Sequence, residues 1–72
     1  MAEIPLAPVE RIMRRVSMGE GVDRISEAAV VELRDRLERI AEKIARRAAI
    51  YAKHAGRKTI HPEDVKLVEL DF

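Results

Sequence analysis

Apolar residues recur along this chain at the three- and four-residue steps of an α-helix, in three separate stretches. The first stretch predicts a helix at about residues 8–18, where Pro8 suits an opening turn. Its apolar positions follow the i, i+3, i+4, i+7 pattern of one helix face, at Val9, Ile12, Met13 and Val16. Gly19 and Gly21 end the pattern, and a loop follows up to residue 25.

The second stretch predicts an unusually long helix at about residues 26–55. Ser26 is a good N-cap, and Gly56 is a good residue to follow the last turn. Between them the apolar steps continue without a break, through Val30, Leu33, Leu37, Ile40, Ile44, Ala48, Tyr51 and Ala55. Such a helix has about 29 residues and is about 43 Å long, against a usual mean of about 11–12 residues.

The third stretch is short and predicts a helix at about residues 62–70. Pro62 and the acidic Glu63 and Asp64 make a favourable first turn, because proline and negative charge both suit a helix N-terminus. The order short, long, short predicts an all-α fold, with a single domain over residues 1–72.

The long helix is too long for its own chain to cover. Each short helix spans roughly 15 Å, so part of the apolar stripe stays exposed unless a second chain covers it. We therefore expect an obligate dimer, whose folding and association are one event. Its core is predicted to contain Leu33, Leu37, Ile40 and Ile44. Alanines permit close helix crossing, at Ala41, Ala45, Ala48, Ala49 and Ala52.

Charge changes this picture only locally, since the formal net charge is +1. Residues 53–62 carry Lys53, Arg57 and Lys58 without any acid. In contrast, Arg46 and Arg47 on the long helix are interpreted as solvent-facing or paired with Glu42. The positive stretch at the end of the long helix is therefore either a candidate anion-binding region or a solvated loop, since cations are favoured near a helix C-terminus.

Other chemistries have little support in the sequence. The chain has no cysteine, and His54 and His61 have no third ligand at a suitable spacing, so neither a metal nor a cofactor is expected. Ser17 and Ser26 have no nearby base, so the protein is not expected to be an enzyme. No apolar run reaches the length of a membrane span, and we expect a soluble cytoplasmic protein.

Three segments resemble the archaeal histones. They are IPLAPVERI at residues 4–12, RISEAA at residues 24–29, and AKHAGRKTI at residues 52–60, which PEDV follows. The resemblance covers nearly the whole chain and is most specific in the last segment. It implies the histone fold, in which two chains cross head to tail in a handshake along their long helices, and it implies an association with the nucleoid.

The resemblance also implies roles for individual residues. Contacts with double-stranded DNA fall on Arg11, Arg14, Arg15, Arg24, Lys53, Arg57, Lys58 and Thr59. Among these, Arg11 matches an arginine that enters the minor groove, and Lys58 matches a phosphate-binding lysine. Arg57 and Asp64 match an internal ion pair that braces the second loop. Contacts between dimers, which allow tetramers or longer oligomers, fall on Tyr51, His54, Asp64 and Leu67.

The chain departs from the family pattern in three places. The stretch between Arg14 and Arg24 is longer than usual, which either adds a turn to the first helix or enlarges the loop. Tyr51 stands where a leucine is usual, so the contact between dimers is expected to differ. The C-terminal VELDF is acidic where relatives are often basic, which weakens non-specific attraction to DNA there.

These observations favour a homodimeric histone-fold protein that binds duplex DNA with little sequence preference and bends or wraps it. The alternative is a histone-fold interaction module that pairs with other proteins or other histone chains and binds DNA weakly; the near-neutral charge favours it. A third possible function is that of a small helical protein that regulates by binding specific DNA sequences. It would need two helices joined by the short turn of a helix-turn-helix, and no such turn is present.

Overall fold

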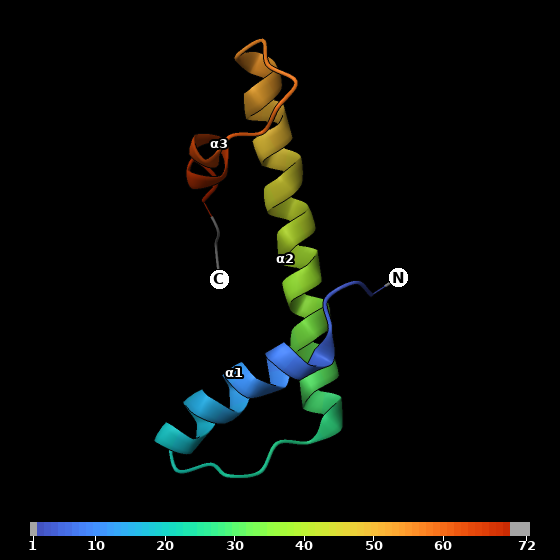
Figure 1. Ribbon diagram of the computed structural model, residues 1–72, viewed down its shortest axis with the longest axis vertical. Helices are drawn as coiled ribbons and strands as arrows, with labels where there is room; N and C mark the ends of the chain where they lie inside the picture. The colour runs from blue at the N-terminus through green and yellow to red at the C-terminus, as the bar shows by residue number, and fades with distance from the viewer. Residues whose placement is uncertain (1, 70–72) are drawn as a thin grey trace. The chain divides into compact units, whose positions relative to one another are not determined.

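The computed structural model describes residues 2–69 and contains three α-helices, in the order α1 (Leu6–Gly19), α2 (Glu27–His54) and α3 (Pro62–Lys66) (Figure 1). Residues 2–69 include no β-strand, so the prediction of an all-α fold is confirmed. The chain divides into two compact units, Met1–Arg39 and Ile40–Phe72, and α2 contributes to both.

In the first unit, α1 begins two residues earlier than the sequence pattern indicated. Pro5 is its N-cap, with an extended backbone at φ −65° and ψ 149°, and Leu6 is the first helical residue. Pro8 therefore sits third in the helix, where a missing N–H costs nothing because the first four N–H groups have no partner within a helix. Val9 of α1 and Val30 of α2 are the buried apolar residues of this unit.

The stretch after Arg14 is divided between the end of α1 and the first loop. The helix continues to Gly19, one residue beyond the expected end, and leaves residues 20–26 as the first loop. Gly21 adopts a positive φ of 79°. The Val22 N–H donates to the Ser17 carbonyl at 2.9 Å, and the Gly21 N–H donates to the Met18 carbonyl at 3.1 Å. This is the Schellman motif, which satisfies the last carbonyls of a helix.

α2 is capped at its start by Ser26, whose Oγ accepts a hydrogen bond from the Ala29 N–H at 3.1 Å. The cap residue itself lies outside the helix, so α2 begins one residue later than expected, at Glu27. At its other end α2 repeats the motif of α1. Gly56 has a φ of 73°, and two hydrogen bonds of 2.9 Å close the turn, from Arg57 N–H to Ala52 O and from Gly56 N–H to Lys53 O.

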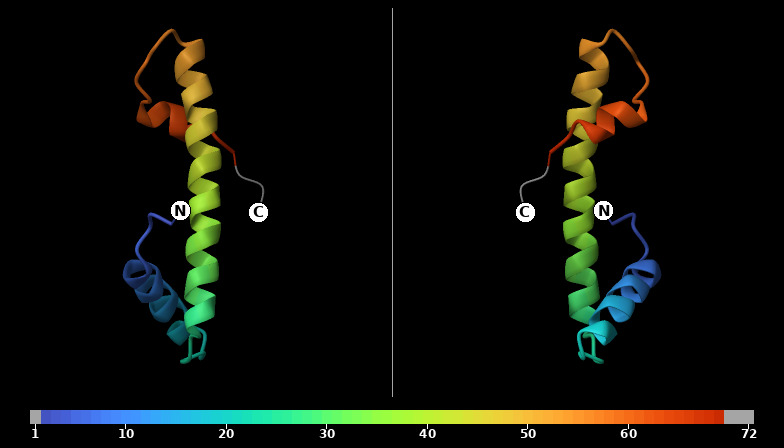
Figure 2. Two further views of the ribbon diagram at one scale, coloured as in Figure 1. Left: turned by 90° about the vertical axis from the view of Figure 1, so that its right-hand side faces the viewer. Right: turned by 90° about the vertical axis from the view of Figure 1, so that its left-hand side faces the viewer.

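In the second unit the loop after Gly56 folds back, and α3 lies beside the C-terminal part of α2 (Figure 2). α3 has five residues and ends at Lys66 rather than near Leu70. A helix of one turn has no intrinsic stability, so its length depends on packing. Leu70, the expected end, lies outside the described residues, as do Asp71 and Phe72.

The buried apolar core of residues 2–69 is small. In the second unit it consists of Ala48 and Ala52. The residues predicted to form a dimer core are only half-buried, namely Leu33, Leu37, Ile40 and Ile44. Large apolar side chains are exposed in both units, among them Ile12, Val16, Met18, Ile60, Val65 and Leu67. The chain alone therefore leaves much of its apolar surface in contact with water.

Candidate nucleic-acid interface

The second loop, residues 55–61, is braced by a bidentate ion pair. Arg57 Nη1 lies 2.9 Å from Asp64 Oδ2, and Arg57 Nη2 lies 2.8 Å from Asp64 Oδ1. The same Asp64 Oδ2 accepts the His61 N–H at 2.8 Å, and Arg57 Nη1 also donates to the Thr59 carbonyl at 2.8 Å. One guanidinium and one carboxylate thus connect the end of α2, the middle of the loop and the start of α3.

The pair stays ionised at any pH near neutrality. The hydrogen bonds from Arg57, and then the one from the His61 N–H, lower the pKa of Asp64 from 3.8 to about 2. The bond to Asp64 raises the pKa of Arg57 above its ordinary value. Asp64 is 3% exposed, and a charge that is this well covered needs such a partner.

The brace leaves other polar groups of the loop pointing to solvent. Lys58 and Thr59 are exposed, and so is Lys53 in the last turn of α2. Within residues 2–69 neither lysine forms an ion pair, whereas the guanidinium of Arg57 is held by Asp64. The structure therefore separates two tasks among the predicted DNA-contacting residues of this unit: Arg57 orders the loop, and Lys53 and Lys58 supply free charge.

The cations of α1 form a second candidate surface, in the first unit. Arg11, Arg14 and Arg15 are all exposed. Arg14 pairs with Glu10 at 3.4 Å, but both side chains are about half exposed, and such surface pairs are weak. Arg11 and Arg15 have no ion-pair partner in the described part of the chain. They lie four residues apart, which places them on one helix face.

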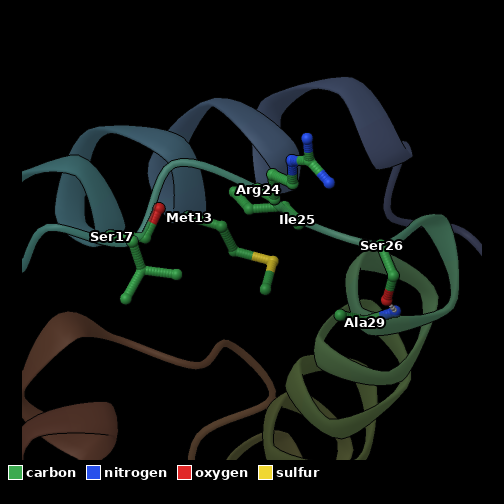
Figure 3. Close-up of a pocket in the computed structure, with 7 residues that line it drawn as sticks. Met13, Ser17, Arg24, Ile25, Ser26 and Ala29 are labelled. Atoms are coloured by element: carbon green, nitrogen blue, oxygen red, sulfur yellow. Dashed lines mark hydrogen bonds between the residues drawn. The ribbon is translucent and has the colours of Figure 1, made fainter.

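The first loop carries Arg24, which is exposed. An open hollow beside it is lined by Met13, Ser17, Val22, Arg24, Ile25, Ser26 and Ala29. Figure 3 shows the Met13 side chain and the Arg24 guanidinium diverging from each other. Most of these lining residues are apolar, and Arg24 is the one that carries a charge.

One interaction in the first unit has no signal in the sequence pattern. Glu38 Oε2 accepts hydrogen bonds from the backbone N–H groups of Glu3 and Ile4, the latter at 2.6 Å. Arg34 Nη1 donates to the Ile4 carbonyl at 3.4 Å. The bonds from Ile4 and Glu3 lower the pKa of Glu38. Glu38 and Arg34 therefore anchor the segment before α1, although periodicity marks both only as polar positions of the long helix.

The residues implied in contacts between dimers differ in accessibility. His54 and Leu67 are exposed, and Tyr51 is half-buried. Asp64 is buried, and both its oxygens accept hydrogen bonds within the chain. The carboxylate consequently presents almost no surface to another dimer, and its place in the structure is the brace of the second loop.

Residues 2–69 offer neither a metal centre nor a membrane span. No group of three or more His, Asp or Glu side chains in that range is placed to hold a metal ion. No helix among the same residues is long and apolar enough to cross a membrane.

Comparison with known proteins agrees with these features. Residues 2–68 match the family described as histone-like transcription factor (CBF/NF-Y) and archaeal histone. An archaeal histone HAN1 subunit of Thermococcus zilligii is 43% identical over 67 residues, which cover 93% of this chain and 94% of that protein. "Probable archaeal histone 3" of Methanocaldococcus jannaschii is 48% identical over 66 residues, which cover 92% of each. The chain therefore belongs to the histone-like transcription factor and archaeal histone family, a histone-fold family of chromosomal DNA-binding proteins rather than of enzymes.

Proposed function

We propose that this chain forms a histone-fold homodimer that binds duplex DNA with little sequence preference and compacts it by bending or wrapping. The observation that carries the proposal is the second loop. There Lys58 and Thr59 stand exposed on a turn that Arg57 and Asp64 hold in place. Fixed cations suit a phosphate backbone, because phosphate contacts supply most of the affinity and carry no sequence information.

The incomplete burial of apolar side chains in the single chain supports a dimer. The central residues of the apolar stripe, Leu33, Leu37, Ile40 and Ile44, are only half-buried. Val65 and Leu67 at the other end of the chain are 46% and 62% exposed. A domain of this size buries little apolar surface and is only marginally stable alone. A second copy that covers these exposed side chains therefore makes the fold stable.

In such a dimer the loop cations and the α1 cations supply three contact regions on DNA. Arg24 of one chain joins Lys53 and Lys58 of the other at each end, and Arg11, Arg14 and Arg15 lie at the centre. Arginines that enter the minor groove without reading bases are the usual means of holding wrapped DNA. Tyr51, His54 and Leu67 are the residues that we propose for assembly of dimers along DNA.

The test is a titration of mixed-sequence duplex DNA, followed by fluorescence anisotropy at several salt concentrations. The logarithm of the binding constant should fall linearly with the logarithm of the salt concentration, by about 0.9 for each phosphate neutralised. Lys58→Glu and Arg11→Ala should weaken binding on all sequences alike. Absence of binding at about 50 mM salt, where phosphate contacts are strong, would refute the proposal.

A second candidate function is a heterodimerising histone-fold module with weak DNA affinity. The name of the relative from Thermococcus zilligii describes it as one subunit, and the net charge of +1 gives little overall attraction to DNA. Sedimentation of the purified chain separates the two candidates. A folded homodimer at micromolar concentration supports the first, and an unfolded or monomeric chain that folds only with a second histone chain supports the second.

A further inference from the structure

Beyond the loops, one side of α2 in the second unit carries unpaired positive charge. Lys43, Arg46 and Arg47 are all exposed. At about 100° per residue they fall within an arc of about 100° on the helix surface. Ala48 and Ala52, which are 0% and 3% exposed, lie about 170° away from the middle of that arc. The three cations therefore occupy the side of α2 that faces away from the core.

On their C-terminal side these cations have no acidic neighbours. No acid occurs between residues 43 and 62, while that range contains Lys43, Arg46, Arg47, Lys53, Arg57 and Lys58. Glu42 precedes Arg46 by four residues, which is a favourable order for an ion pair. Nevertheless, the described part of the chain shows no ion pair for Lys43, Arg46 or Arg47. Repulsion among such closely spaced cations is relieved by a bound polyanion.

We propose that Lys43, Arg46 and Arg47 form an additional DNA-binding face of α2, which contacts the phosphate backbone. This inference rests on the proposed function and adds a surface to it. The face continues towards Lys53, about 15 Å along the helix from Lys43, and so adjoins the cations of the second loop. DNA presents one charge per about 1.7 Å of its axis, so several phosphates fit along that length.

Duplex DNA fits this face better than an acidic protein does. Interfaces between proteins usually have an apolar centre with aromatic anchors. Between residues 43 and 54 the arc contains, besides the three cations, Ile50, at 42% exposure, and His54, without Phe, Trp or Tyr. Interfaces with DNA are instead dominated by positive charge.

The test compares the wild-type protein with the triple variant K43A/R46A/R47A. Alanine favours helix, so α2 is expected to persist, which circular dichroism checks. The slope of the binding constant against salt should fall by about 0.9 for each phosphate that is no longer neutralised, or about 2.7 per chain. Two control variants accompany it. K43R/R46K/R47K keeps the charge and should keep the slope. K66A removes an exposed cation of α3 and should leave the slope unchanged. The matching single variant R46A should lower the slope by about 0.9 per chain.

The outcomes separate this inference from the proposed function. If the wild-type protein does not bind DNA, the proposed function fails and the inference fails with it. If the wild-type protein binds with a steep salt dependence and the triple variant has the same slope, only the inference is overturned. Lys43, Arg46 and Arg47 then face solvent or bind an acidic partner. If K66A lowers the slope as much as R46A does, the effect is one of net charge, and the inference is likewise overturned.

Discussion

The two loops of this molecule begin in the same way and then differ. Each follows a helix that ends in a Schellman motif, with a glycine at positive φ, Gly21 in one and Gly56 in the other. The next residue is Val22 in the first loop and Arg57 in the second. Val22 is 54% exposed, whereas Arg57 reaches across the second loop to Thr59 and Asp64.

The difference shows what holds each loop together. In the described chain, the side-chain hydrogen bonds near the first loop stay at its ends, from Ser17 to the Arg14 carbonyl and from the Ala29 N–H to Ser26. The first loop thus depends on its backbone and its flanking helices. The second loop has a charged side-chain connection that spans it, and its exposed Lys58 stands on a preorganised turn, which reduces the ordering cost of binding.

Loss of the ion pair in the second loop should destabilise the protein more than any other substitution considered. In Asp64→Ala the Arg57 guanidinium loses its partner, and the His61 N–H loses its acceptor. Loss of one member of a covered, hydrogen-bonded ion pair is among the most destabilising single changes. At fixed protein concentration we expect the melting temperature to fall by on the order of 10 °C, as measured by circular dichroism.

The control for this variant is Glu10→Ala, which removes the exposed ion pair with Arg14 at 3.4 Å. We expect its melting temperature to stay within about 2 °C of the wild-type value, because such pairs contribute little. Equal losses in the two variants would mean that the second loop does not depend on its brace.

The stabilisation that the Asp64 carboxylate provides should depend on pH. The pKa of Asp64 is lowered from 3.8 to about 2, so the stabilisation by its charged form is complete well above pH 4 and is lost as the pH falls through about 2. Asp64→Asn lacks this contribution at every pH. The difference in melting temperature between the wild-type protein and Asp64→Asn should therefore be constant from pH 7 to pH 5 and shrink towards pH 2. A difference that stays constant down to pH 2 would contradict the lowered pKa.

Because both loops begin with the same backbone motif, replacing its glycine should destabilise the two loops equally. Gly21→Ala and Gly56→Ala each place a Cβ at positive φ, and neither Cβ would meet an atom within 4 Å apart from those of the adjacent residues. The cost is then conformational only, about 1 kcal/mol for each variant. A fall in melting temperature of about 4–8 °C is expected in both cases. A much larger loss in Gly56→Ala would show that the brace requires this backbone geometry more strictly than the motif does.

The sequence predicted the parts of this fold that depend on local periodicity and on residues with special roles. The three helices follow from apolar spacing, Ser26 was identifiable as a cap, and the pairing of Arg57 with Asp64 followed from the resemblance to the archaeal histones. The expected start of α1 differs by two residues from the observed start at Leu6, because a proline is tolerated at any of the first positions of a helix. The end of α3 was wrong because packing, which periodicity does not report, limits a one-turn helix.

Interactions between distant segments were not predictable. Glu38 binds the N–H groups of Glu3 and Ile4, and every residue except proline carries such a donor, so no residue type marks the partner. The suggested pairing of Glu42 with Arg46 is absent from residues 2–69, since exposed pairs at that spacing are permitted but only weakly favoured. The other expectation for these residues, that Arg46 and Arg47 face solvent, is confirmed.

Loss of the Arg24 side chain should have little effect on the stability of the protein. Arg24 is exposed, and its guanidinium has no ion-pair partner in the part of the chain that the structure describes. Arg24→Ala should therefore change the free energy of unfolding by less than about 0.5 kcal/mol, while it weakens DNA binding and lowers the salt slope by about 0.9 per chain. Urea denaturation and anisotropy titration of the same preparation measure the two quantities. A clear loss of stability in Arg24→Ala would reveal a brace in the first loop that is formed by the second chain of the dimer, and the two loops would then differ only in where the brace comes from.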